Sequence, residues 1–480
     1  MPSEIEVVVD TRPLWLILLS RGRHTFYLAF GMGLYWITLA APLPHGLTRE
    51  GQKALAVFAL CVFYWVFSVL PLMITSLLAI ILLPLSGVMR SSQAYALFGN
   101  EAVFFILGAF ILAACFMKSG LSTRIALGLL HRFGSTPRRL LLTVYVLNSV
   151  MAFFMSEHAV AAMNFPIIVE MVAVLGLPRM RSNYARCLFL AMAWGSSIGG
   201  IATLLGGARA PLALGILREA TGQSYSFLEW TLLALPLVLV LMVAGYWIMI
   251  WFFPIEIETV AGVEELLNER WMKLGRASFE ERTIGAVMLV TLIAWIVGGE
   301  EFGLANIALA AVVVLFMLGI VTWRDIEHHV NWGVLLMYGG AIALGAAINS
   351  SGAAAWLSQV TISHWASNGF TVVLLMSLVS LLLTEAMSHS AVVALLMPVS
   401  IGVAKEFGLD PRLMAPVVAL PAGLAFTLPI GTPANAIAYS SGYLRMRDML
   451  LPGALLELLA WLAFNLSARW YWPLLGIHIQ

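Results

Sequence analysis

The sequence predicts an all-α polytopic membrane protein with about 11 transmembrane helices and two re-entrant hairpins in inverted repeats. The first observation behind this prediction is composition: of 480 residues, 61% are hydrophobic and only 11% are charged, less than half the charged share of a typical soluble protein. The second is a series of apolar runs of about 17–25 residues, each long enough to span a bilayer. The third is a pair of longer apolar stretches, each with a polar cluster near its middle, which marks a functional site.

Charge and cysteine content argue against several other classes of protein. The net charge of +1 gives no reason to expect a nucleic-acid partner. Cys61, Cys115 and Cys187 lie in or beside apolar runs without metal or redox spacing, so we interpret them as inert thiols. The first apolar run lacks a clear cleavage site, and we expect a retained first helix rather than a signal peptide.

The N-terminal segment, 1–53, is predicted to contain a polar tail and a first helix at 25–41. Arg21 and Arg23 precede that helix, so the positive-inside rule predicts a cytoplasmic N-terminus. We expect the protein to be integral to a bacterial inner membrane. Basic residues between 118 and 139 predict a second cytoplasmic region. Further helices are expected at 54–69, at 71–87 and from Glu101 onward.

The first long apolar stretch, 140–177, carries Ser156, Glu157 and His158 near its middle. Basic clusters flank both ends, and a single crossing helix would leave one of them outside. A hairpin that enters from the cytoplasm, turns at the polar tip and returns keeps both basic clusters on the cytoplasmic side. Such a tip is tolerated within the membrane only if protein or a cavity surrounds it. The remaining elements of a first repeat, 54–253, are a glycine-broken helix at 185–220 and a helix at 228–253.

The second half repeats this order after a charged segment, 254–282, which we expect to be a cytoplasmic amphipathic linker. Its long apolar stretch, 370–404, carries Ser388, His389 and Ser390 near the middle. Because its flanks are poor in basic residues, this hairpin is expected to enter from outside. Such inverted repeats are typical of secondary transporters, with the binding site between them. The second repeat is expected at 283–447, and a last segment follows at 448–480. Their other elements are helices at 283–298, 304–321, 331–349 and 452–474, an interfacial segment at 352–366 and a broken helix at 412–446.

The chemistry of the polar breaks favours an anionic ligand. Freed N–H groups and the positive ends of half-helices attract anions, whereas freed carbonyl groups suit small cations. Hydroxyl groups donate to carboxylate or sulfate oxygens, an arginine pairs bidentately with a carboxylate, and a protonated histidine donates as well. The candidate substrate-binding residues are Ser156, Glu157, His158, Arg209, Ser388, His389, Ser390, Thr432, Pro433 and Asn435.

Several candidates also have a structural interpretation that the sequence leaves open. The serines at the two tips can cap the helices that follow them, which is compatible with contact to a ligand. Arg209 can be a structural ion-pair partner of Glu157. His389 can be a buried histidine with satisfied hydrogen bonds.

These motifs resemble those of the divalent anion/sodium symporter family, the INDY-type di- and tricarboxylate transporters. The resemblance is carried by the two tips with Pro166 and Pro398 downstream, by SIGGIATL at 197–204, WGVLLMYGGAIALG at 332–345 and LPIGTPANAI at 428–437. It implies a homodimer whose transport part moves in an elevator-like motion, with substrate held between the tips and sodium beneath each tip. The residues for which it implies cation-binding or coupling roles are Glu157, Gly206, Thr384, His389 and Gly431.

Both tips depart from the family pattern, in which each reads Ser-Asn-Thr. Glu157 and His389 replace the two asparagines, and Arg209 lies at 206–210, where the family reads Gly-Thr-Pro-Pro-Asn. A positive charge on Arg209 or His389 repels Na⁺. We therefore hypothesise that fixed or protonatable cations replace part of the sodium requirement. The coupling would then be to Na⁺ or H⁺, or transport would proceed by anion exchange.

The sequence therefore predicts secondary active transport of small divalent or trivalent anions. Di- or tricarboxylates are the leading substrates and sulfate is the alternative. We expect no enzyme activity and no cofactor apart from Na⁺ or H⁺ as a coupling ion. The expected partners are the small anion, membrane lipid and a second copy of the chain. A passive anion channel is a distant alternative, as is an intramembrane metalloenzyme using Glu157, His158 and His389, which lack the spacing of metal ligands.

Overall fold

The computed structural model describes residues 14–361, 366 and 368–479, and every regular element within these ranges is helical. The first helix, α1, spans Leu14–Ala40, whereas the sequence predicted a polar tail followed by a helix at 25–41. That prediction was wrong for residues 14–24, because arginine is a good helix former and Arg21 and Arg23 continue the helix that begins in the apolar run before them. The part of the predicted tail at 1–13 lies outside the described residues.

The helices fall on both sides of the charged central segment. The first half contains α2 (Arg49–Val66), α3 (Leu72–Leu85), α4 (Ser91–Ala96), α5 (Glu101–Lys118), α6 (Leu121–Phe133), α7 (Pro137–Met151), α8 (Glu157–Val174), α9 (Asn183–Gly200), α10 (Arg209–Thr221) and α11 (Phe227–Phe252). The central segment contains α12 (Ala261–Leu274), and the second half contains α13 (Phe279–Phe302), α14 (Leu304–Met317), α15 (Trp323–Ile326), α16 (Trp332–Ser350), α17 (Ala353–Thr361), α18 (Gly369–Thr384), α19 (His389–Glu406), α20 (Met414–Ala419), α21 (Pro433–Ser440) and α22 (Met446–Leu466). Short 3-10 segments lie at Leu97–Gly99, Pro411–Leu413, Pro421–Gly423 and Trp472–Leu475, and a π-helical segment lies at Ser467–Tyr471.

Many of these helices begin directly after a polar residue that caps them. The side chain of the capping residue accepts a hydrogen bond from an N–H group of the first turn, which has no partner within the helix. Helix starts are therefore set locally, by residues that the sequence alone identifies. The capping residues include Thr48, Asn100, Thr136, Ser156, Ser182, Ser226, Ser278 and Ser388.

Two further regions differ in detail from the sequence-based expectation. The basic region at 118–139 contains an additional amphipathic helix, α6, which buries Ala126, Leu127 and Leu130 on one side. The broken helix expected at 412–446 is a pair of short helices, α20 and α21, and α22 begins earlier than the predicted 452. Gly442 has a φ of +72°, a geometry that ends a helix, so the chain turns before α22 instead of continuing α21.

Seven segments of the described chain are long and apolar enough to cross a membrane by length and composition. They contain α5, α8, α11, α13, α16, α19 and α22. Three further apolar helices, α3, α14 and α18, are shorter, with 14, 14 and 16 residues. The protein is thus an all-α polytopic membrane protein, as the sequence predicted.

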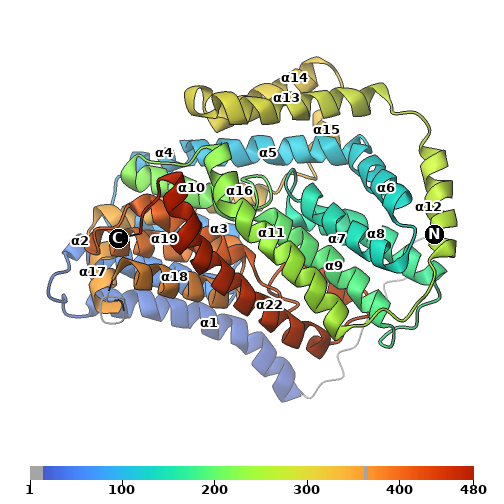
Figure 1. Ribbon diagram of the computed structural model, residues 1–480. Helices are drawn as coiled ribbons and strands as arrows, with labels where there is room; N and C mark the ends of the chain where they lie inside the picture. The colour runs from blue at the N-terminus through green and yellow to red at the C-terminus, as the bar shows by residue number, and fades with distance from the viewer. Residues whose placement is uncertain (1–13, 362–365, 367, 480) are drawn as a thin grey trace.

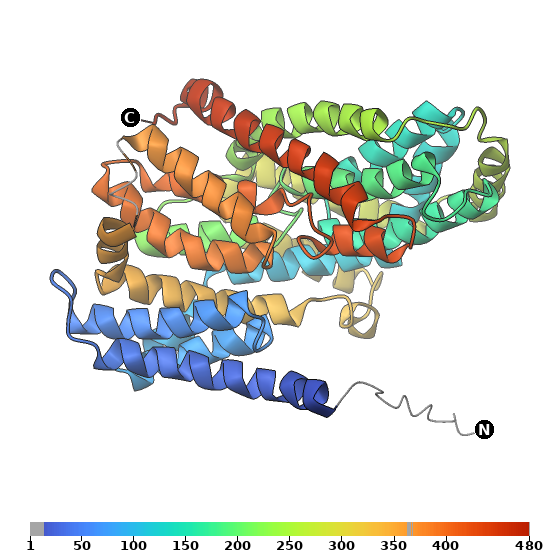
Figure 2. The ribbon, with the colours of Figure 1, turned by 90° about the horizontal axis from the view of Figure 1, so that it is seen from below.

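The helices form an elongated bundle with α1 along one edge and the α13–α14 pair along the opposite edge (Figure 1). α14 packs against α5, and α1 packs against α2. Between these edges, α7, α8 and α9 pack on one another, as do α18, α19 and α20, and α11 lies beside α22 (Figures 1 and 2). α10 contacts α19, α20 and α16, so the break that precedes α10 lies next to the second hairpin.

Candidate functional site

Two helix–break–helix units carry the polar tips that the sequence identified. α7 and α8 meet at the first tip, and α18 and α19 meet at the second. In both units a serine with extended backbone geometry precedes the second helix. Ser156 Oγ accepts a hydrogen bond from Ala159 N at 3.4 Å, and Ser388 Oγ accepts one from Ala391 N at 3.3 Å. Both serines therefore act as helix caps.

The correspondence between the two units extends beyond the capping residues. α8 and α19 each contain 18 residues, and each has a proline at its tenth position, Pro166 in α8 and Pro398 in α19. Both prolines lie inside a helix, so they do not shape the turns at the tips.

The N-terminal ends of α8, α10 and α19 bring Glu157, Arg209 and His389 into direct contact. Glu157 Oε1 lies 3.2 Å from Arg209 Nη1 and 3.1 Å from His389 Nδ1. Arg209 Nη1 also lies 3.2 Å from His389 Nδ1. A carboxylate from the first tip thus sits between two basic side chains, one from the first broken helix and one from the second tip.

All three side chains of this cluster are withdrawn from solvent. Glu157 is 0%, Arg209 2% and His389 6% exposed. A buried ion pair is costly unless hydrogen bonds satisfy its remaining polar atoms. Glu157 Oε2, Arg209 Nη2 and His389 Nε2 have no hydrogen-bond partner among the described residues. Three buried polar atoms of the cluster, a carboxylate oxygen, a guanidinium nitrogen and an imidazole nitrogen, thus form no hydrogen bond with the described residues.

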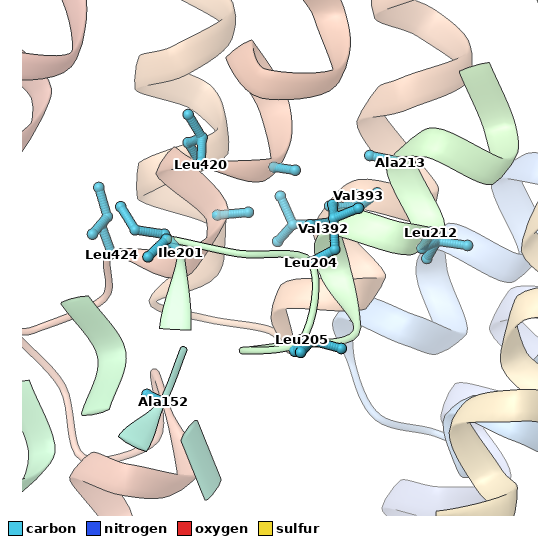
Figure 3. Close-up of a cluster of buried hydrophobic side chains, with 14 of the residues drawn as sticks. Ala152, Ile201, Leu204, Leu205, Leu212, Ala213, Val392, Val393, Leu420 and Leu424 are labelled. Atoms are coloured by element: carbon cyan, nitrogen blue, oxygen red, sulfur yellow. The ribbon is translucent and has the colours of Figure 1, made fainter. Parts of the chain in front are cut away.

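Apolar side chains surround the break between α9 and α10. Figure 3 shows Leu204 and Leu205 on the break itself, with Val392 of α19 and Leu424 among the neighbouring buried side chains. Such walls exclude water and lower the local dielectric constant. The attraction between Arg209 and a carboxylate is therefore stronger here than at a surface.

Two glycines allow the backbone to approach the Arg209 guanidinium closely. A Cβ atom at Gly207 would lie 2.6 Å from Arg209 Nη1, and one at Gly423 would lie 2.6 Å from Arg209 Nη2. Gly423 belongs to the 3-10 segment before the second break. Arg209 is therefore enclosed by both broken helices as well as by both tips.

At the second break, two carboxylates bind backbone N–H groups instead of cations. Glu385, directly after α18, accepts hydrogen bonds from Thr427 N at 3.1 Å and Leu428 N at 2.8 Å. Glu457 of α22 accepts from Phe426 N at 2.7 Å, from Thr427 N at 2.8 Å and from the Thr427 hydroxyl. The protein's own carboxylates thus satisfy the N–H groups freed by this break. Neither carboxylate has a basic ion-pair partner in the part of the chain that the structure describes.

Carbonyl groups near the second break are also held by side chains. Thr384 donates its hydroxyl to Ala422 O at 2.7 Å. Asn435 Nδ2 donates to Ala425 O at 3.1 Å and to Leu428 O at 3.2 Å. Its Oδ1 is buried and has no hydrogen-bond partner within the described ranges. Carbonyl and amide oxygens of this kind are suitable ligands for a small cation.

The other predicted cation-binding residues also lie at the breaks. Gly206 O accepts a hydrogen bond from Glu157 N at 3.0 Å, which connects the first break to the first tip. Gly431 packs against the second tip, since a Cβ atom there would lie 3.0 Å from Glu385 Oε2. Any larger residue at 431 would press on that carboxylate.

The remaining predicted substrate-binding residues lie apart from the buried cluster or at its margin. The His158 side chain is 49% exposed, and its Nδ1 lies 3.7 Å from Glu157 Oε1. Ser388 and Pro433 are exposed, and Ser390 is half-buried. Thr432 is buried at the start of α21, where its hydroxyl accepts a hydrogen bond from Asn435 N at 3.0 Å. α21 itself packs against α8 and α9.

Sequence reasoning missed Glu457 and gave Glu385 no role. Glu457 lies in the apolar middle of α22, whose other acidic residue, Asp448, belongs to the first turn. An ionisable residue at membrane depth is itself a signal of function. That signal identifies Glu457 as unusual. Its partners lie 30 and 31 residues earlier, and no local pattern indicates them.

Comparison with known proteins identifies a matching family model and relatives that are named as transporters. A family model described as "Sodium:sulfate symporter transmembrane region" matches residues 23–478. The sodium-dependent dicarboxylate transporter SdcS of Staphylococcus saprophyticus is 28% identical, over 94% of this chain and 92% of that protein. The SdcS protein of Staphylococcus aureus is 27% identical, with the same coverage.

Two solved structures of membrane transporters share the fold. The YdaH transporter of Alcanivorax borkumensis aligns with a TM-score of 0.54 at 15% identity, covering 80% of this chain and 87% of that one. MtrF of Neisseria gonorrhoeae aligns with a TM-score of 0.57 at 15% identity, covering 92% of this chain and 94% of that one. At this level of identity the likeness concerns the fold alone.

Proposed function

Because the chain belongs to the sodium:sulfate symporter transmembrane family, we propose that it carries small dicarboxylates across the membrane in symport with Na⁺. A member of this family is a transporter and not an enzyme, and no cofactor is implied beyond the coupling ion. The staphylococcal relatives are named sodium-dependent dicarboxylate transporters, which supports both the substrate class and Na⁺. The description of the family itself names sulfate, which is the second candidate substrate.

The observation that carries the proposal is the buried position of Arg209 between both tips and both broken helices. A guanidinium is always charged and presents paired N–H groups that match a carboxylate. Nη2 of Arg209 is left without a hydrogen-bond partner among the described residues. We assign Arg209 as the principal contact for one carboxylate of the substrate, with His389 as a second donor. The capping serines and the start of α21 would contact the rest of the substrate.

A specific observation favours a second candidate for the coupling. Glu157 and His389 stand where the family tips carry asparagines, and Glu157 pairs with Arg209 at 3.2 Å. A fixed positive charge beside the first predicted sodium position weakens Na⁺ binding there. Coupling to H⁺, or anion exchange, is therefore the alternative to strict Na⁺ symport.

The arrangement of the transporter forms part of the same proposal. The matched lengths of α8 and α19, with a proline at the same position in each, support two repeats at 54–253 and 283–447, joined by the linker at 254–282. Within them we propose two oppositely oriented hairpins, 140–177 and 370–404. The transporter would function as a homodimer by an elevator motion, in a bacterial inner membrane, with its N-terminus in the cytoplasm.

Uptake into liposomes tests the proposal directly. Purified protein is reconstituted, and uptake of labelled succinate, citrate and sulfate is measured at two pH values, with or without an inward Na⁺ gradient. We expect concentrative succinate uptake that requires Na⁺. Uptake that ignores Na⁺ but follows a pH gradient or a preloaded anion supports the alternative coupling. If no anion is transported under any condition, the proposed function is wrong.

Two variants compare the loss of Arg209 with the loss of another arginine from the same helix. Arg209→Gln should abolish succinate uptake. Arg218→Gln is the matched control, because Arg218 lies on the same helix but is half-exposed and pairs with Glu101. Glu157→Gln should change the pH dependence of uptake if Glu157 takes part in coupling. An unchanged pH profile in that variant indicates a purely structural carboxylate.

A further inference from the structure

A groove between α6 and α7 combines two arginines with apolar walls. It encloses about 370 Å³, and its lining includes Leu129, Arg132 and Phe133 of α6 and Arg139, Leu142 and Val146 of α7. This volume lies in the range of small-molecule binding pockets. The groove is distinct from the site between the hairpin tips, with which it shares no residue.

Helical spacing explains why these side chains form one groove. Leu129, Arg132 and Phe133 are three and four residues apart, so they lie on one face of α6. Arg139, Leu142 and Val146 are spaced in the same way on α7. The short connection between the helices turns these two faces toward a common space. Both arginines lie near that connection, whereas Leu142 and Val146 lie further along α7.

The apolar walls of the groove are open to the surroundings of the protein. Phe133 is 50%, Leu142 44% and Val146 40% exposed. Exposed apolar side chains that lie close together are typical of surfaces that contact a membrane or another protein. A lipid chain lying along them would therefore remain in an apolar environment.

The charges of the groove have no acidic partner in the part of the chain that the structure describes. Arg132 and Arg139 have no ion pair within the described ranges, and no acidic side chain lines the groove. The guanidinium of Arg132 lies 5.9 Å from the centre of the Phe133 ring. By contrast, Arg124 of the same helix is held by Glu281 at 2.9 Å. The groove thus presents two unpaired guanidinium groups beside an apolar surface.

We propose that this groove binds an anionic phospholipid. The phosphate lies between Arg132 and Arg139, and one acyl chain follows Leu142 and Val146 along α7. Guanidinium groups are well suited to phosphate oxygens, and the positive-inside rule predicts that this basic region faces the cytoplasmic leaflet, where basic groups attract anionic lipids. The site goes beyond the proposed transport of dicarboxylates and depends on neither the substrate nor the coupling ion.

The lipid would contact the first arm of the first hairpin. α7 ends at Met151, close to the tip that carries Glu157. A bound lipid at the start of α7 would therefore stabilise the hairpin that bears half of the candidate transport site. Any effect of the bound lipid on the rate of transport can be measured separately from lipid binding itself.

Lipid binding is tested on the full-length protein in nanodiscs and by native mass spectrometry. The probes are phosphatidylglycerol and phosphatidylcholine with identical acyl chains. We expect wild type to bind phosphatidylglycerol roughly tenfold or more tightly than phosphatidylcholine, and Arg132→Gln/Arg139→Gln to lose this preference. The matched control, Arg324→Gln/Arg447→Gln, removes two exposed arginines outside the groove and should retain it. An unchanged preference in the groove variant, or an equal loss in the control, overturns the proposal.

A second pair of measurements separates a lipid site from a simple anion site. Leu142→Ser/Val146→Ser keeps both arginines and should weaken phosphatidylglycerol binding, because the acyl chain loses its apolar contact. Inorganic phosphate at millimolar concentration should leave most of the lipid bound. Complete displacement by phosphate, or full lipid affinity in the apolar variant, shows that the groove is an anion site and contradicts the proposal. Unchanged melting temperatures of the lipid-free variants verify that all of them fold.

Discussion

The two hairpin tips share their backbone geometry, but the carboxylate at each tip has a different kind of partner. At the first tip, Glu157 lies between Arg209 and His389 and is fully buried. At the second tip, Glu385 accepts hydrogen bonds from backbone N–H groups and shares the N–H of Thr427 with a second carboxylate, Glu457. One carboxylate is therefore balanced by positive charge, and the other is held by neutral donors.

This difference shows which break retains capacity for an anion. The sequence suggested that the N–H groups freed by both breaks attract a substrate. At the second break, those of residues 426–428 are already occupied by Glu385 and Glu457. At the first break, the positive group is a side chain, Arg209, one nitrogen of which has no hydrogen-bond partner among the described residues. The comparison favours a substrate carboxylate at Arg209 and a cation near the second break, where two carboxylates lie close together without a basic partner among the described residues.

The largest effect is expected when the charge balance of the first tip is removed. Arg209→Gln removes the permanently charged one of the two basic partners of the fully buried Glu157 and leaves only His389. This loss should cost about 3–5 kcal/mol of stability. The melting temperature of the purified protein measures this loss. The double variant Arg209→Gln/Glu157→Gln should recover most of the stability but not the transport. Equal stability of the single and double variants would contradict the inferred pairing.

At the second tip, the two carboxylates should be energetically coupled through Thr427. Glu385→Ala and Glu457→Ala should each cost about 1–3 kcal/mol, because each leaves one backbone N–H without an acceptor. In each single variant Thr427 N keeps one acceptor, whereas the double variant removes both. The loss in the double variant should therefore exceed the sum of the single losses in a double-mutant cycle. Additive losses would show that the two carboxylates act independently.

The smallest effects should come from the capping serines, where the two tips are most alike. Ser156→Ala and Ser388→Ala should each lower stability by about 0.5–2 kcal/mol, since each removes one cap from a helix of the same length. If the serines also contact substrate, the KM for uptake should rise in both variants beyond what the stability loss explains. Glycine at each position, which costs only a few tenths of a kcal/mol as a cap, is the control. An unchanged KM in all four variants would restrict both serines to capping.

Much of the local structure follows from short-range rules, and the sequence therefore predicted it. Ser156 and Ser388 begin helices because a side-chain oxygen accepts from the N–H three residues later. The breaks could be predicted as well, because polar residues within a long apolar stretch can be recognised from their position in the sequence alone. α6 was not predicted, because the basic residues in this part of the sequence suggested a cytoplasmic connection. The apolar residues Ala126, Leu127 and Leu130 nevertheless form a buried face.

By itself, the sequence determined an all-helical membrane protein with two corresponding polar tips, and it identified Glu157, Arg209 and His389 as unusual residues. Only the tertiary structure decided that these three meet, because Arg209 and His389 are 180 positions apart and no local pattern specifies which distant helix end a side chain will face. The same holds for Glu457, which reaches N–H groups 30 and 31 residues earlier. Caps and breaks depend on neighbours along the chain, whereas the charge balance of a buried site depends on how the helices pack.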